Sequence, residues 1–366
     1  MKIKSVRLER YKRFVDTTFD FVDEDTGKPY DLIVLVGENG CGKSSILQAI
    51  AAILGEATGQ LHQARDLNWP GFVIDTIDAN RSGKSRITLD IVFKKDELEA
   101  TQEYYNKADI AHYLRQYDID LFLDENIKLH FYHDTSQVYE GYVIRAGETS
   151  ELPDQFKGRG YASSLIVKRI ASHDILKRVG GVFWYHELRN ESTLTPHYDN
   201  GWDDEEESFD KKIAKNALNA IRELFTGWFA EENKSRVTKF NKIYQQFFPD
   251  RTLSRIESYT YSRAMSRPIY FKTLNDNFEY ELAELSGGER ALLPIIIDFV
   301  QWDINNSVIL IDELELHLHP PLQRALIYNL QNLGNNNQFI ITTHSDYVAN
   351  MVRAIPRSKL IRVDNV

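Results

Sequence analysis

The sequence is poor in cysteine, with Cys41 as its single copy among 366 residues. One cysteine excludes an intrachain disulfide and a cysteine-based zinc framework, and it is typical of a protein from a reducing compartment. No apolar run approaches the roughly 18 residues of a membrane-spanning helix. The charged segment at residues 1–14 does not resemble a signal peptide. We therefore expect a cytoplasmic protein with no membrane partner.

Positive charge is also scarce, because 44 Lys and Arg face 54 Asp and Glu, for a net charge of −10. This balance argues against a globally basic surface for nucleic acid, although it does not exclude a local basic groove. The sequence lacks sustained heptads, which excludes long coiled-coil arms. It also lacks an HExxH pattern, a His-Asn-His cluster and a nucleophile elbow. Any nuclease activity is therefore expected in a partner.

A phosphate-binding loop is the first motif that the sequence does contain. Residues 32–36 form a short β-branched run typical of a buried strand, and residues 37–44 (GENGCGKS) fit G-x-x-x-x-G-K-[ST] completely. Apolar residues then recur at helical spacing. Backbone N–H groups and the helix N-terminus would bind phosphates, Lys43 would reach the β- and γ-phosphates, and Ser44 would bind Mg²⁺. The predicted nucleotide contacts are Asn39, Gly40, Cys41, Gly42, Lys43, Ser44 and Ser45.

A second apolar strand, residues 307–311, ends in the acidic pair Asp312-Glu313. Taken alone, two acids at a strand end are also typical of a helix cap. Beside a phosphate-binding loop they predict a Walker B pair, in which Asp312 holds Mg²⁺ through water and Glu313 polarises the attacking water. A further strand, residues 338–343, ends at His344.

The run LSGGER at residues 285–290 lies in the sequence between the phosphate-binding loop and the acidic pair Asp312-Glu313. Together with the N-terminal strand, DELELHLHP and TTHS, it resembles the RecF/SMC/OLD-like branch of ABC-type ATPases. The sequence is most similar to compact bacterial ATPases such as the ATPase subunits of Septu- and PARIS-like defence systems. The resemblance covers residues 1–60 and 278–366, and the middle of the chain matches only in outline.

The resemblance implies a dimer in which Ser286, Gly287 and Gly288 of one copy close over the ATP held by the other. It also implies that His344 contacts the γ-phosphate. The segment with Glu315, His317 and His319 corresponds to the D-loop of this family; a zinc site is the alternative interpretation. Leu314 departs from the family pattern, where proline is frequent.

The resemblance predicts an α/β fold, namely an ABC-type P-loop ATPase head with a mixed β lobe I, a helical lobe II and no long coiled coil. We expect residues 1–205 to form lobe I, residues 206–285 to form lobe II, and residues 286–366 to complete lobe I. Four runs with strand character are expected to form an antiparallel layer of lobe I: residues 85–93, 127–132, 138–145 and 182–188.

The predicted function is that of an ATPase that dimerises around MgATP and switches a separately encoded effector, such as a nuclease, in antiviral defence. The alternatives are an ATP-gated scaffold with little turnover and a DNA repair ATPase of RecF/SMC type. Higher oligomers and DNA are further candidate partners, and an OLD-type nuclease domain is not expected. The helix expected at residues 97–117 is rich in tyrosine and is best interpreted as a half-buried core helix; the alternative is an effector contact through Tyr104, Tyr105, Tyr113 and Tyr117. Three residues remain candidates for the Q-loop glutamine: Gln102, Gln116 and Gln137.

Overall fold

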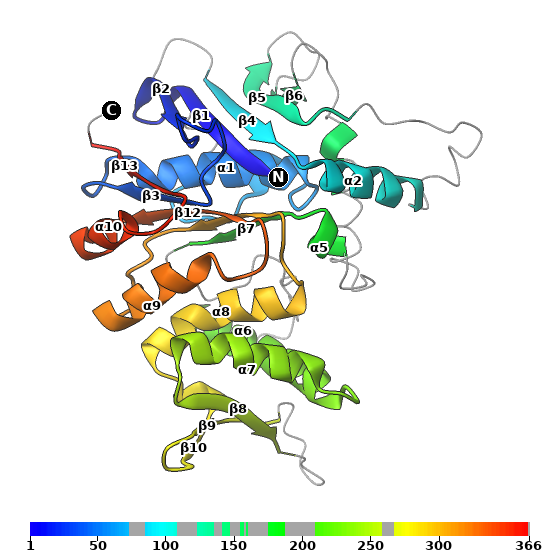
Figure 1. The fold of residues 1–366 in the computed structure, drawn as a ribbon, viewed down its shortest axis with the longest axis vertical. Helices are drawn as coiled ribbons and strands as arrows, with labels where there is room; N and C mark the ends of the chain where they lie inside the picture. The colour runs from blue at the N-terminus through cyan, green and yellow to red at the C-terminus, as the bar shows by residue number, and fades with distance from the viewer. Residues whose placement is uncertain are drawn as a thin grey trace. The chain divides into compact units, whose positions relative to one another are not determined.

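In the computed structural model, which describes most of the chain, the protein forms two compact units (Figure 1). Unit 1 comprises Met1–Glu187, Trp302–Glu315 and Leu330–Val366, and unit 2 comprises Leu188–Gln301 and Leu316–Asn329. Among the described residues, no helix combines the length and the apolar character needed to cross a membrane. The described residues are 1–72, 85–107, 123–134, 141–146, 154–156, 159, 175–186, 209–257 and 267–364.

A five-stranded parallel sheet forms the centre of unit 1, in the order β13-β3-β12-β11-β7. Four of its strands are buried along their whole length, as expected for strands covered on both faces. The strands predicted before the phosphate-binding loop, the acidic pair and His344 are all members of this sheet. The five strands are β3 (Leu32–Val36), β7 (Val182–Tyr185), β11 (Val308–Ile311), β12 (Gln338–Thr343) and β13 (Ser358–Arg362).

The position of β7 corrects one expectation from the sequence. We placed residues 182–188 in the antiparallel layer, whereas β7 pairs in parallel with β11, with Tyr185 opposite Ile311. A run of four apolar residues has no alternation that would distinguish a half-buried antiparallel strand from a fully buried parallel one. The consequence for function is that the end of β7 lies beside the end of β11, where Asp312 donates its backbone N–H to Tyr185 O at 2.8 Å.

An antiparallel sheet in the order β2-β1-β4-β5-β6 forms a second layer of unit 1. The strand predicted at residues 85–93 and the predicted hairpin are confirmed as β4 and the antiparallel pair β5–β6. The N-terminal segment contributes β1, which pairs with β2 on one side and with β4 on the other. The five strands are β1 (Lys2–Tyr11), β2 (Phe14–Asp20), β4 (Arg86–Val92), β5 (Asn126–Asp134) and β6 (Gly141–Ala146).

Helix α1 (Lys43–Ala57) lies between these two sheets (Figure 1). Its apolar side chains join one core cluster with residues from both sheets, including Leu35 of β3 and Leu89 of β4. A helix buried on both sides has little freedom to move, so its N-terminus is a rigid support for the loop before it. The described part of unit 1 also contains the helices α2 (Lys95–Lys107), α5 (Ile175–Arg178) and α10 (Asp346–Val352).

Unit 2 combines helices with a small antiparallel sheet in the order β10-β9-β8. Its core is aromatic, with Phe240 of α7 in ring contact with Phe225, Tyr244 and Phe271. The longest described helix, α6, has 22 residues, and the described residues contain no long coiled coil, as predicted. The elements are α6 (Phe209–Ala230), α7 (Ser235–Phe247), β8 (Arg251–Ile256), β9 (Ile269–Thr273), β10 (Glu279–Glu281), α8 (Gly287–Gln301) and α9 (Pro320–Leu330).

The signature helix α8 groups with unit 2, although the sequence-based division placed residues 286–366 with lobe I. Several residues discussed from sequence lie outside the described part of the chain. These are Tyr113, Gln116, Tyr117 and Gln137, and of Tyr104 the side chain is not described.

Candidate functional site

The loop between β3 and α1 has two glycines at which a Cβ would meet closely packed neighbours, and one of them also has a left-handed backbone. Gly42 has φ +99°, and a Cβ there would lie 2.6 Å from Phe14 Cζ. A Cβ on Gly37 would lie 2.6 Å from the carboxylate oxygen Asp364 Oδ1, which accepts the Glu38 N–H at 2.8 Å. The loop is therefore packed against β2 and the C-terminal segment, which explains why its glycines cannot be replaced without a shift of their neighbours.

Lys43 is buried and turns back over its own loop. Its Nζ donates to Gly37 O at 2.8 Å and to Glu38 O at 2.9 Å, and Cys41 Sγ lies 3.9 Å away. Burial raises the pKa of the Cys41 thiol, so this cysteine acts as a small apolar residue of the loop and is not poised as a nucleophile. The ammonium is thus held at the loop, where the predicted phosphate contacts begin.

Two oxygen ligands for a cation converge at the ends of the parallel strands. Ser44 Oγ at the start of α1 donates to Asp312 Oδ1 at the end of β11, with a distance of 3.0 Å. Mg²⁺ is commonly held by one or two carboxylates together with hydroxyl, water and phosphate oxygens, and seldom by a complete cage of protein ligands. The described residues contain no cluster of three or more His, Cys, Asp or Glu that could hold a metal alone. The donor set therefore fits a magnesium ion that shares its coordination with a nucleotide.

Thr342 of β12 organises the acidic pair from the neighbouring strand. Its hydroxyl donates to Asp312 Oδ1 and accepts the backbone N–H of Glu313 at 2.8 Å, while its carbonyl accepts the N–H of Leu314 at 3.0 Å. Glu313 has φ +44°, a conformation that is unusual outside glycine and asparagine. The bond to the Thr342 carbonyl needs an N–H at position 314. Leucine supplies this N–H, whereas the proline that is frequent in the resembled family lacks it.

His344 follows β12 directly and is held by Glu315. The carboxylate oxygen Oε1 accepts the backbone N–H of His344 at 2.7 Å and lies 2.9 Å from its Nδ1. Thr343, just before it, is opposite Val36 at the end of β3. His344 therefore lies at the strand edge where the phosphate-binding loop begins, as the sequence predicts.

The signature residues belong to unit 2, where Ser286 caps helix α8. Ser286 Oγ accepts the Glu289 N–H at 3.3 Å, and Glu289 Oε2 accepts the Ser286 N–H at 2.9 Å, which is a reciprocal capping box. Ser286 and Gly287 are exposed. The N-terminus of α8 thus presents a hydroxyl and free N–H groups at its surface, which is a favourable arrangement for an anion.

A network of hydrogen bonds around the buried Glu289 carboxylate stabilises the capping turn at the start of α8. Glu289 is 1% exposed and accepts hydrogen bonds from Tyr244 at 2.6 Å and Tyr280 at 2.9 Å, and it forms an ion pair with Arg251 at 2.6 Å. Burial alone would raise its pKa, but the hydrogen bonds from Arg251, Tyr244 and Ser286 outweigh burial and lower the pKa to about 2. The network keeps Glu289 ionised and holds the capping box in place.

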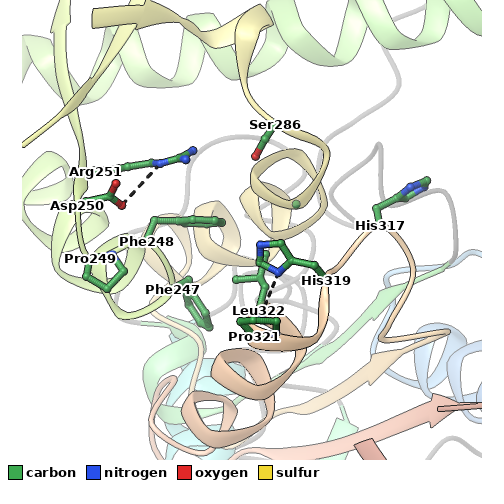
Figure 2. A pocket seen from close by; sticks show the side chains of 11 residues that line it. Phe247, Phe248, Pro249, Asp250, Arg251, Ser286, His317, His319, Pro321 and Leu322 are labelled. Carbon is green, nitrogen blue, oxygen red and sulfur yellow. Dashed lines mark hydrogen bonds and ion pairs between the residues drawn. The ribbon is translucent and has the colours of Figure 1, made fainter. Parts of the chain in front are cut away.

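A pocket of about 420 Å³ lies beside the signature turn within unit 2. Figure 2 shows Phe248, from the α7–β8 connection, opposite His319, from the segment before α9, with Ser286 and Arg251, the first residue of β8, above these two rings. His319 Nδ1 accepts the Leu322 N–H at 3.3 Å, and thus caps α9. Within the described residues, neither His317 nor His319 belongs to a metal-ligand cluster, which removes the basis for the zinc interpretation.

The structure brings together Lys43, Ser44, Asp312 and Glu313, with His344 at the same strand edge. Sequence reasoning missed Thr342 and the contact between Glu315 and His344. A polar residue in a buried strand is the one signal that could have pointed to Thr342, but the same strand also contains Gln338 and Thr343. Glu315 was singled out, but its partner lies 29 positions away and no local pattern identifies it. Of the three candidates for the Q-loop glutamine, Gln102 is the one that lies among the described residues, and it is on α2. The residue that follows β7, the strand next to β11, is His186 and not a glutamine.

The strand order, the phosphate-binding loop and the acidic pair define an ABC-type P-loop ATPase head. A family model described as "AAA domain, putative AbiEii toxin, Type IV TA system" matches residues 32–350. Because the match spans most of the sequence, the chain belongs to this family of ATPase domains, whose fold binds nucleotides.

Two curated relatives are similar to the chain over nearly its whole length. A retron Ec83 probable ATPase from Escherichia coli is 23% identical, with 96% of this chain and 70% of the relative covered. A retron Vc95 probable ATPase from Vibrio cholerae serotype O1 biovar El Tor is 21% identical, with 96% and 72% covered. Among solved structures, an Smc head bound to the C-winged helix domain of ScpA is 17% identical, with a TM-score of 0.48 and 94% and 90% of the two chains covered.

Proposed function

We propose that this chain binds and hydrolyses MgATP and uses the cycle as a conformational switch. The observation that carries the proposal is the 3.0 Å contact between Ser44 and Asp312 beside the buried Lys43. These three residues bring a cation, a hydroxyl and a carboxylate to the N-terminus of one helix, which is the combination that a magnesium-bound triphosphate requires.

Each of the site residues that unit 1 supplies has a distinct role in this proposal. Lys43 exchanges its two carbonyl partners for the β- and γ-phosphate oxygens. Ser44 and Asp312 hold Mg²⁺, which when bound neutralises phosphate charge. Glu313 orients the attacking water as general base, and His344 contacts the γ-phosphate. Support comes from the shared strand edge of these residues and from Thr342, which fixes Asp312 and Glu313 in register.

The signature residues act in trans, on the nucleotide bound by a second copy of the chain. Support comes from the exposed capping turn at Ser286, which presents N–H groups at a helix N-terminus, and from the open pocket beside it. In an isologous dimer each copy supplies one phosphate-binding loop and one signature turn to each site. Removal of the γ-phosphate would release the two heads, so that hydrolysis would control association.

The switch acts on a separately encoded effector in bacterial antiviral defence. The support is the similarity over 96% of the chain to two proteins named as retron ATPases. The described residues offer the components of an ATP site but no second cluster of metal-ligating residues that would serve a nuclease. The effector is therefore expected to carry the second activity.

The proposed activity is tested by measuring ATP binding and turnover of the purified chain and of Lys43→Ala. The variant removes the ammonium that faces the phosphates, and it should lose tight ATP binding. Lys28→Ala removes an exposed lysine outside the site and should bind ATP as the wild type does. A wild-type chain that binds ATP without turnover would favour the alternative of an ATP-gated scaffold, whereas unchanged binding by Lys43→Ala would contradict the assignment of the loop.

A further inference from the structure

Glu315 is a buried carboxylate that the ATPase roles above do not use. It follows the acidic pair by two residues, and its side chain is 9% exposed. Its Oε1 accepts the His344 backbone N–H at 2.7 Å and lies 2.9 Å from His344 Nδ1. One oxygen therefore receives two contacts from a single residue, which directly follows the neighbouring strand β12.

The other oxygen of Glu315 shows how specific this pairing is. Oε2 is buried and has no hydrogen-bond partner among the described residues. Burying a carboxylate oxygen without a partner is unfavourable, and a carboxylate placed only for fold stability would be expected to satisfy both oxygens. The ion pair that the described residues give Glu315 is the one with His344. We therefore attribute the placement of Glu315 to its contacts with the backbone N–H and the ring of His344.

The chemistry of the contact determines the state of the imidazole ring. A carboxylate oxygen can only accept, so a hydrogen bond across the 2.9 Å between this oxygen and Nδ1 requires that Nδ1 carries the proton. The ring nitrogen left for another partner is Nε2, on a side chain that is 50% exposed. The backbone contact at 2.7 Å holds the start of the turn after β12, so the same carboxylate fixes both the main chain and the ring.

We propose that Glu315 is a positioning residue that fixes the Nδ1–H form of His344 and directs Nε2 toward the γ-phosphate end of the nucleotide. A ring that donates to a phosphate oxygen must also carry a proton on Nε2, and in that form the Nδ1–H still needs the acceptor that Glu315 supplies. This inference rests on the proposed ATPase function. It assigns to the segment after the acidic pair a role within one copy of the chain, in addition to any role at a dimer interface.

Two substitutions separate position from charge. Glu315→Gln keeps an acceptor oxygen for both N–H groups and removes the charge, whereas Glu315→Ala removes the acceptor as well. We expect Glu315→Ala to lower kcat for ATP by about 10- to 100-fold, the scale of a lost orienting partner, with a much smaller change in KM. Glu315→Gln should recover part of that loss. The control Glu24→Ala removes an exposed carboxylate in the β2–β3 connection and should change neither constant.

A double-mutant cycle with His344→Ala tests whether Glu315 acts through the histidine. If it does, Glu315→Ala should have no further effect on kcat once His344 is absent. Effects of the two substitutions that multiply would overturn the proposal, because they would mean that Glu315 acts by another route.

Nitrogen NMR of histidine-labelled protein gives a readout that does not depend on turnover. His344, identified by its loss in His344→Ala, should show a protonated Nδ1 in the wild type and in Glu315→Gln, and a shift toward the Nε2–H form in Glu315→Ala. Identical His344 signals in the wild type and Glu315→Ala would overturn the proposal. A wild-type chain without ATPase activity would contradict the proposed function, while the NMR comparison would still decide the state of the ring.

Discussion

The hydroxyl of Ser44 donates to Asp312 Oδ1 at 3.0 Å, which joins the first turn of α1 to the end of β11. The two residues are 268 positions apart in the chain. They meet because β3 and β11 both flank β12 in a parallel sheet, whose carboxyl ends share one edge. The predicted nucleotide site thus depends on sheet order as much as on the motifs themselves.

Thr342 is expected to be essential for the geometry of that edge. Thr342→Val keeps the shape of the side chain but removes one of the two hydroxyl donors to Asp312 Oδ1, the other being Ser44, and removes the acceptor of the Glu313 N–H. We expect a loss of about 1–3 kcal/mol in the free energy of unfolding, measured by chemical denaturation, together with slower ATP turnover. Thr342→Ser retains the hydroxyl and should restore most of the turnover. Wild-type turnover in Thr342→Val would show that the hydroxyl does not position the acidic pair.

The buried Glu289 predicts a particular acid sensitivity of unit 2. Its pKa is lowered to about 2 from an ordinary value of 4.5. The ionised carboxylate therefore contributes stability that is fully present above pH 4.5 and is lost as the pH falls toward 2. Glu289→Gln removes this titration, so the difference in unfolding free energy between the wild type and the variant should shrink as the pH falls through this range. A difference that stays constant between pH 5 and pH 2 would contradict the network.

The sequence predicted the strands and loops of the site because those motifs are local. GENGCGKS, the strand before Asp312 and the strand before His344 each lie within one continuous segment, and all were found at the predicted places. The partner of a short buried strand is not encoded locally, which is why β7 was assigned to the wrong sheet. The roles of Thr342 and Glu315 depend on contacts between residues that are far apart in the chain, and a single sequence does not reveal such contacts.

Nucleotide-driven association is expected if the signature turn acts in trans. Glu313→Gln with MgATP should have a higher mass in light scattering than the same protein without nucleotide. Adding Ser286→Arg should prevent this increase, because it places bulk and charge where the γ-phosphate would lie. Thr238→Arg adds the same side chain at an exposed position of α7 and should leave the association intact. Equal masses with and without ATP would contradict association driven by the nucleotide.

A separate effector is expected to supply the second activity of the system. The purified chain should not cleave DNA with Mg²⁺ or Mn²⁺, and co-expression with the neighbouring open reading frame should give a complex that survives gel filtration. Metal-dependent DNA cleavage by the isolated chain that is lost on substitution outside the ATP site would contradict this expectation. The Glu315→Ala variant described above should still form the complex, since its change lies within the site of one copy.

The Glu313→Gln variant gives the most direct test of the central claim that this chain is an ATPase with Glu313 as its general base. ATP binding and steady-state turnover should be measured in the same samples for the wild type and the variant. Binding should be retained, because the backbone N–H of Glu313 still reaches Thr342. Turnover should fall by roughly 10²-fold or more, the scale of a lost general base. Turnover at the wild-type rate in Glu313→Gln would contradict the account.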